Sequence, residues 1–210
     1  AGLGVTVRTG FMARGYARDG DHVHAVKGAE ADIPCDLILV GIGAVADTAL
    51  AQGAGIACNV GILTDAHLRT SAPHVWAIGD VAETPHWQVG VALRVESVQN
   101  ATDQARHLAR LLSGAEPTPF RTVPWFWSDI GPLKLQIAGL AMGADRRVVR
   151  DEGARLAVFH LAEDRLVSVE TLNSPADHMI ARQLLESGRT PPDAVMVEGA
   201  AALKAWLAQR

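Results

Sequence analysis

Asp80 is the residue of this sequence whose position most directly suggests chemistry. It follows an apolar run, residues 75–78, that is typical of a buried strand, and Gly79 lets the backbone approach another group closely. Ligands of open α/β sheets bind beyond the carboxyl ends of the strands, where a carboxylate can accept hydrogen bonds from cofactor hydroxyl groups. An ionised carboxylate only accepts hydrogen bonds, which favours a sugar or ribityl hydroxyl over a phosphate. The alternative is that Asp80 caps a helix or turn beginning at Val81.

The clearest helix in the sequence comes shortly after Asp80. Ser97 is a suitable N-cap, and Gly114 is a suitable end. Spacings of three and four predict a face toward the core that consists of Val98, Ala101, Ala105, Leu108 and Leu112. The opposite face then carries Asp103, Arg106, His107 and Arg110.

The region before Asp80 contains three candidate strands and one short helix. Residues 5–8 and 22–27 alternate apolar and polar side chains, and residues 35–43 are apolar up to Gly41 and Gly43. The first run has no methionine or leader before it, as if the chain were entered within an element. The three runs fit the last quarter of a nucleotide-binding domain, and an ordinary α/β hairpin fits them as well. Residues 47–55 predict a short helix with Asp47 as its N-cap.

The last part of the chain has an antiparallel β pattern that begins beyond a proline-containing linker at residues 115–120. Residues 133–137 alternate, and residues 155–161 and 165–172 predict a hairpin. A helix follows, with Ser174 as N-cap, Pro175 at its first position and Gly188 at its end, and residues 199–210 predict another helix. These elements predict a small α+β domain, in which the arginines between residues 146 and 155 form a solvated face.

The composition limits the classes of function. The chain has 210 residues, 49% of them hydrophobic, and a formal net charge of −4, so it can bury a core but has no overall field that would attract nucleic acid. Cys35 and Cys58 have no spacing typical of a disulfide framework or a zinc site, so both are expected as buried thiols with no bound metal. No apolar run is long enough to span a bilayer. The sequence therefore predicts a soluble, cytoplasmic protein.

Three stretches carry a resemblance to a known family. They are "TSAPHVWAIGDVAETPH", "RVESVQNATDQARHLARLLSG" and "VPWFWSDIGPLKLQIAGL", in this order. Together they resemble the second half of the flavin-dependent NAD(P)H:ferredoxin reductases that serve cytochrome P450 and aromatic ring-hydroxylating oxygenase systems. The resemblance covers essentially the whole chain. It implies an α/β fold, namely the second half of a flavoprotein with two dinucleotide-binding domains (FAD and NAD) plus a C-terminal α+β domain.

The resemblance also implies roles for individual residues. Gly79 and Asp80 match the pair that holds the ribityl chain of FAD, and Glu96, Val98 and Gln99 lie where the start of a helix meets the isoalloxazine ring. Trp127 matches an aromatic residue near the flavin and the nicotinamide of NAD(P)H, although a core tryptophan remains an alternative. No catalytic acid or base is obligatory, since the flavin carries the chemistry.

Other residues match segments away from the flavin. Gly41 and Gly43 begin a segment that resembles the link between the NAD and FAD domains, but Ala46-Asp47 replaces the family's Pro-Asn there. An acidic 2Fe–2S ferredoxin is the expected partner, with Arg106 and Lys134 as docking cations and Arg110 extending the patch.

The main departure from the family is the absence of both G-x-G-x-x-G fingerprints. The resemblance therefore implies the C-terminal half of a reductase roughly twice as long. Residues 1–45 would end the NAD-binding domain, residues 46–116 would belong to the FAD-binding domain, and residues 117–210 would form the C-terminal domain. The alternatives are a non-catalytic binding or assembly module of reductase ancestry, or a related NAD(P)H-dependent rubredoxin or disulfide reductase. The choice between NADH and NADPH and the oligomeric state stay open.

Overall fold

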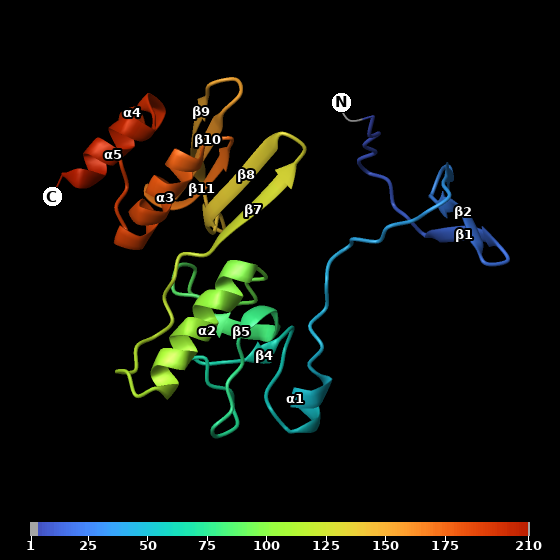
Figure 1. The fold of residues 1–210 in the computed structure, drawn as a ribbon, viewed down its shortest axis with the longest axis horizontal. Coiled ribbons are helices and arrows are strands. Elements are labelled where there is room, and N and C mark those ends of the chain that lie inside the picture. The colour runs from blue at the N-terminus through green and yellow to red at the C-terminus, as the bar shows by residue number, and fades with distance from the viewer. Residues whose placement is uncertain (1–3, 210) are drawn as a thin grey trace. The chain divides into compact units, whose positions relative to one another are not determined.

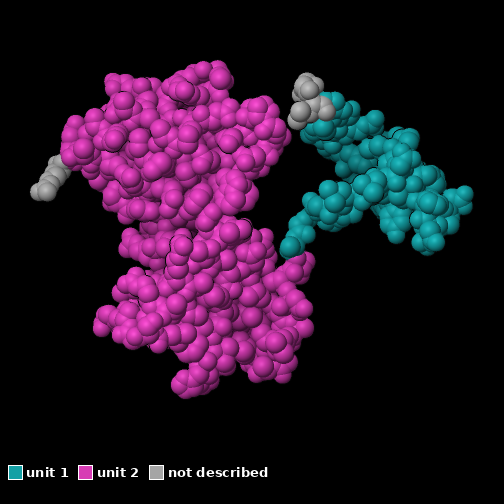
Figure 2. All heavy atoms as spheres, viewed as in Figure 1, with its two compact units in different colours: residues 1–44 teal, residues 45–210 magenta. Residues whose placement is uncertain are grey.

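A computed structural model describes residues 4–209, and the chain divides into two compact units, Ala1–Ala44 and Val45–Arg210 (Figure 2). The first unit contains a three-stranded antiparallel sheet in the order β1-β2-β3. Its strands are β1 (Gly15–Asp19), β2 (His22–Lys27) and β3 (Ile33–Pro34). The predicted strand over residues 22–27 is confirmed as β2, and its partner β1 was not predicted.

Two of the strands predicted in the first unit are wrong. Residues 5–8 are not a strand, and residues 35–43 are irregular, with Leu37, Leu39 and Ile42 more than four-fifths exposed. A strand that is apolar on both faces needs neighbouring strands and cover on both sides. Among the described residues of this unit, the small sheet gives residues 35–43 no neighbouring strands and no cover on either face. Cys35 is half-buried rather than buried.

The second unit begins with short elements around one long helix (Figure 1). These elements are α1 (Ala49–Gly53), β4 (Ile62–Leu63), β5 (Ala82–Pro85), β6 (Ala92–Leu93) and α2 (Val98–Leu112). The pairing of β4 with β5 is parallel, whereas that of β5 with β6 is antiparallel. The predicted N-cap of α1 is wrong by one residue, because Thr48 holds the cap position and its side chain makes no capping hydrogen bond. Asp47 still contacts the start of α1, since its Oδ1 accepts a hydrogen bond of 3.1 Å from the N–H of Ala49.

The strand predicted before Asp80 is wrong. Residues 75–78 are extended, but they form only an isolated bridge between Trp76 and Arg69. Gly79 has a φ of +73°, which interrupts an extended chain, and residues Gly79–Val81 form a 3-10 turn. Asp80 therefore precedes the buried strand β5 instead of following one.

Helix α2 has the predicted cap but not the predicted buried face. The Ser97 hydroxyl accepts a hydrogen bond of 3.1 Å from the N–H of Asn100, which confirms the N-cap. Val98 and Leu112 are at least 60% exposed, whereas Asn100 and Gln104 are buried. These amides can be buried because each bonds to backbone: Asn100 Nδ2 donates to the carbonyl of Val95, and Gln104 Oε1 accepts from Gly79.

The C-terminal part is an antiparallel five-stranded sheet in the order β7-β8-β11-β10-β9, with its helices on one side (Figure 1). The strands are β7 (Trp125–Ile130), β8 (Leu133–Gly139), β9 (Arg146–Asp151), β10 (Leu156–Ala162) and β11 (Arg165–Leu172). The helices are α3 (Pro175–Ser187), α4 (Asp193–Glu198) and α5 (Ala200–Ala208). The predicted β10–β11 hairpin, the helix from Pro175 to its Gly188 C-cap and the last helix are all confirmed.

The core of this part lies between the sheet and α3, which packs on β8 and β11. Phe159, Leu161, Val169 and Leu184 are fully buried there. The predicted solvated face of arginines is wrong at one position, because the side chain of Arg150 is only 7% exposed and forms an ion pair with buried Asp177. Strand β9, which carries Arg150, and helix α4, whose Met196 carbonyl accepts a hydrogen bond from it, were not predicted.

Candidate functional site

The turn that carries Asp80 is held against helix α2. The N–H of Gly79 donates a hydrogen bond of 2.6 Å to Oε1 of Gln104, and the backbone of Gly79 lies close to Ala101. The Asp80 side chain is exposed and accepts no hydrogen bond from residues 4–209. It therefore does not cap the turn, and its oxygen atoms are available to a ligand.

The start of α2 offers donors beside this turn. The Ser97 hydroxyl accepts from Asn100, whereas the N–H groups of Val98 and Gln99 have no acceptor among the described residues. Free N–H groups and the helix dipole together favour a ligand atom with negative charge or a lone pair. The acceptor oxygens of Asp80 and the backbone donors of α2 thus lie on neighbouring segments.

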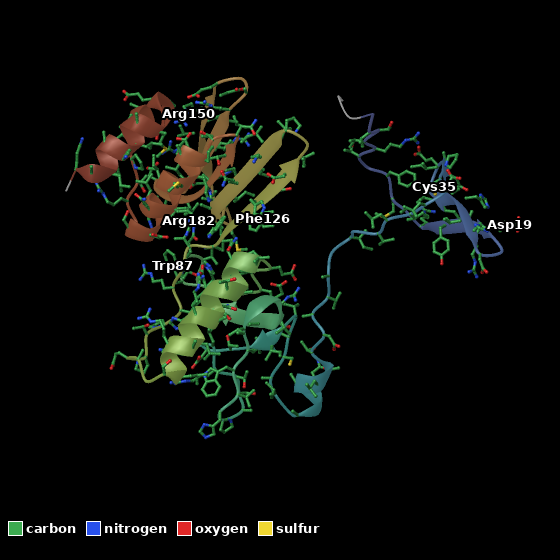
Figure 3. The ribbon with its side chains drawn as sticks, in the orientation of Figure 1. Asp19, Cys35, Trp87, Phe126, Arg150 and Arg182 are labelled. Atoms are coloured by element: carbon green, nitrogen blue, oxygen red, sulfur yellow. The ribbon has the colours of Figure 1, made fainter. Side chains whose placement is uncertain are left out.

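A small pocket of about 150 Å³ separates the start of α2 from the five-stranded sheet. Glu96 and Ser97 line it from the helix side, and Phe126 and Ile137 line it from strands β7 and β8. Phe126 pairs with Ile137 and Trp127 pairs with Gln136, so these two aromatic side chains lie on opposite faces of β7. Phe126, which Figure 3 labels, was missed by the sequence analysis, although the three consecutive aromatic residues 125–127 were the signal that could have found it.

Trp127 lies on the same face of β7 as Trp125. Their ring centroids are 5.9 Å apart, and Trp127 is 41% exposed, so it is not a core residue. Trp125 is fixed from α3: the guanidinium of Arg182, which Figure 3 labels, lies 4.7 Å from the centre of its ring, and the ring centre of His178 lies 5.4 Å from it. Burial and the nearby charge of Arg182 lower the pKa of His178 to about 4, so this imidazole is neutral at neutral pH.

The predicted docking residues lie on two elements. Arg106 and Arg110 lie one turn apart on the exposed side of α2, where Arg106 is 3.7 Å from Asp103. Lys134 lies on β8 with its side chain exposed, and its backbone exchanges two hydrogen bonds with Asn173. Gly41 and Gly43 belong to the first unit, where they lie in exposed irregular chain.

Two further kinds of feature are absent from residues 4–209. No group of three or more His, Cys, Asp or Glu side chains there could hold a metal ion. None of the helices described is long and apolar enough to cross a bilayer.

The fold and these motifs define a class of protein. Residues 1–105, half of the chain, match the model of the pyridine nucleotide-disulphide oxidoreductase family, and residues 125–207 match that of the reductase C-terminal domain. The chain belongs to the pyridine nucleotide-disulphide oxidoreductase family. This finding confirms the family and the α/β fold class inferred from the three sequence stretches.

Particular members of the family resemble the chain along most of its length. Rhodocoxin reductase of Rhodococcus erythropolis is 43% identical over 195 residues, which cover 90% of this chain and 43% of that protein. Putidaredoxin reductase of Pseudomonas putida is 36% identical over 87% of this chain and 44% of its own length. The chain therefore spans less than half the length of these two relatives.

Solved structures agree with these relatives. The ferredoxin reductase for the CYP199A2 system from Rhodopseudomonas palustris matches with a TM-score of 0.90 and 38% identity, over 95% of this chain and 50% of that one. A covalent putidaredoxin reductase–putidaredoxin complex matches with a TM-score of 0.88 and 32% identity, over 97% of this chain and 50% of that one.

Proposed function

We propose that this chain provides the C-terminal part of the FAD site and the ferredoxin-docking face of an NAD(P)H:ferredoxin reductase. The observation that carries the proposal is the pairing of a free carboxylate at Asp80 with free N–H groups at Val98 and Gln99, held together by the bond between Gly79 and Gln104. This donor and acceptor set fits a ligand with hydroxyl groups at one end and an electron-rich ring edge at the other. The relatives named above, a rhodocoxin reductase and a putidaredoxin reductase whose complex with putidaredoxin has been solved, support the same activity.

In this proposal, bound FAD would supply the chemistry, taking a hydride from NAD(P)H and giving single electrons to a 2Fe–2S ferredoxin. Asp80 would accept hydrogen bonds from the ribityl hydroxyls. The start of α2, with Glu96, Val98 and Gln99, would face the isoalloxazine ring and stabilise negative charge on it. Trp127, which is partly exposed, would lie beside the flavin and the nicotinamide.

The domain assignment is part of the same proposal. Residues 1–45, which include Gly41 and Gly43, would end the NAD-binding domain, and residues 46–116 would belong to the FAD-binding domain. Residues 117–210 would be the C-terminal domain. The first boundary is supported by the compact unit of residues 1–44. We also propose a cytoplasmic location, which the free thiols of Cys35 and Cys58 support, because thiols stay reduced in that compartment.

Replacing Asp80 with alanine in the full-length protein should weaken FAD binding without unfolding the protein. The loss of charge-assisted hydrogen bonds to hydroxyl groups costs roughly 1.5–3 kcal/mol, which corresponds to a roughly 10- to 150-fold rise in Kd. Titration of the cofactor-free protein with FAD, followed by flavin fluorescence, measures this change. Asp21→Ala, which removes an exposed carboxylate from the turn between β1 and β2, is the matched control. An Asp80→Ala protein that binds FAD as tightly as the control would refute the assignment.

Reversing the charges of Arg106 and Lys134 should slow reduction of an acidic ferredoxin. Both side chains are exposed cations, and charge-steered encounters lose roughly tenfold or more in association rate at low salt when rim charges are reversed. The variant should also depend less on salt, while electron flow to ferricyanide should stay unchanged because that small acceptor needs no docking face. Stopped-flow reduction of the ferredoxin over a range of salt concentrations is the measurement.

The control for this experiment is Arg147→Glu, which reverses an exposed charge on the distant edge strand β9 of the same sheet. If the control slows ferredoxin reduction as much as the double reversal does, the effect is one of net charge, and the docking face is not where we place it.

A further inference from the structure

Arg94 links the two segments that face the proposed ligand. It follows strand β6, and its side chain is only 15% exposed. Its Nη1 donates a hydrogen bond of 3.0 Å to the backbone carbonyl of Asp80, while its Nη2 forms an ion pair with the carboxylate of Glu96. One guanidinium thus contacts both the 3-10 turn and the residue just before the N-cap of α2.

The space for this side chain is built by a glycine. A Cβ at Gly61 would lie 2.6 Å from Cδ of Arg94 and 2.7 Å from the carbonyl oxygen of Val81, so any larger residue would displace the arginine or the turn. Glu83 on β5 is 5% exposed and fixes the position of Gly61, because its Oε2 accepts from the N–H of Gly61 at 3.1 Å. Its Oε1 accepts from Nδ2 of Asn59 at 3.0 Å. The aliphatic part of the Arg94 side chain is therefore positioned by Gly61, and its guanidinium is positioned by Asp80 and Glu96.

The charge of Glu96 gives this arrangement an electrostatic consequence. Glu96 lines the pocket at the start of α2, where a carboxylate would repel negative charge on a ligand. The Arg94 guanidinium neutralises it at close range. The free N–H groups of Val98 and Gln99 favour negative charge at the start of α2. Without Arg94, the unpaired carboxylate of Glu96 would oppose this effect by repelling negative charge at the same position.

We propose that Arg94 is a positioning residue for the flavin. It fixes the spacing between Asp80 and the start of α2, and it cancels the charge of Glu96 beside the isoalloxazine ring. The inference rests on the proposed function, since it assumes that FAD spans these two segments. It predicts two separable effects of losing the arginine: weaker FAD binding, from the loosened turn, and a more negative flavin midpoint potential, from the unpaired Glu96 carboxylate.

The test uses the full-length protein and compares wild type with Arg94→Met, Arg94→Lys and the double variant Arg94→Met with Glu96→Gln. Arg94→Met should raise the Kd for FAD about tenfold, as expected for the loss of a hydrogen bond to a charged group, and should make the midpoint potential more negative. Arg94→Lys restores the charge but not the fork geometry, so the potential should return toward the wild-type value while FAD binding recovers only in part. The double variant should recover the potential but not the affinity.

Arg69→Met, which removes an exposed arginine of the same region, is the control and should change neither quantity. If Arg94→Met does not fold, Arg94→Lys tests the positioning role instead. An Arg94→Lys protein with the same flavin midpoint potential and the same Kd for FAD as wild type would overturn that role. An Arg94→Met protein that loses thermal stability but keeps the wild-type Kd and potential also overturns it. Wild-type protein that binds no FAD would instead refute the proposed function itself, and the inference with it.

Discussion

Replacing Asp177 with alanine should lower the free energy of unfolding by about 3–5 kcal/mol, because it leaves a buried guanidinium without its main counterion. Asp177 is 2% exposed and accepts hydrogen bonds from Arg150 and from the Ser174 hydroxyl. Arg150, on β9, keeps only partial compensation from Glu152 at 3.1 Å and from the carbonyl of Met196 at 2.9 Å. The ion pair joins β9 to α3 (Figure 3 labels Arg150), so its loss should weaken the packing of the C-terminal part. Denaturant unfolding with a constant m-value measures the change.

Asp164→Ala is the matched control for this prediction. Asp164 Oδ1 lies 2.8 Å from Nη2 of Arg146, which is on β9 like Arg150, but the side chain of Asp164 is 86% exposed. An exposed pair contributes about 0–1 kcal/mol, so the control should be nearly neutral. Equal losses in the two variants would show that the Arg150 pair is as solvated as the sequence suggested. Replacing Arg150 and Asp177 together by apolar residues should cost less than Asp177→Ala alone.

Gly139→Ala should destabilise the protein by about 2–5 kcal/mol through a backbone clash combined with an unfavourable backbone conformation. Gly139 ends β8 with a φ of +76°, and an added Cβ would lie 2.2 Å from the carbonyl oxygen of Val167 on β11. That oxygen cannot move freely, since it accepts a hydrogen bond of 3.1 Å from the N–H of Leu140. The free energy of unfolding again serves as the measurement.

Gly143→Ala separates the two causes. Gly143 has nearly the same φ, +77°, but a Cβ there would meet nothing within 4 Å. This control should therefore show only the conformational cost of about 1–2 kcal/mol. If Gly139→Ala costs no more than Gly143→Ala, the close approach between β8 and β11 is not as tight as the structure has it.

Features that depend on neighbouring residues could be predicted from the sequence alone. Helix α3 begins after Ser174 at Pro175 and ends at the Gly188 C-cap, as its local signals indicated. The β10–β11 hairpin and the Ser97 cap of α2 are local in the same sense. The family could also be predicted, because each of the three characteristic stretches is a continuous run of residues that needs no partner elsewhere to be seen.

Features that depend on distant partners were decided by the tertiary structure. Gln104 is buried because its carbonyl oxygen finds the N–H of Gly79, 25 residues away, and this bond turns a polar side of α2 toward the core while leaving Val98 exposed. Arg150 is buried because Asp177 lies opposite it, 27 residues away. The bridge from Arg94 to Asp80 likewise needs the space left by Gly61. The spacing of apolar and charged residues in a sequence indicates only whether each side chain prefers water. A polar group can be buried when another part of the chain provides a hydrogen-bond or ion-pair partner, and that depends on the tertiary structure.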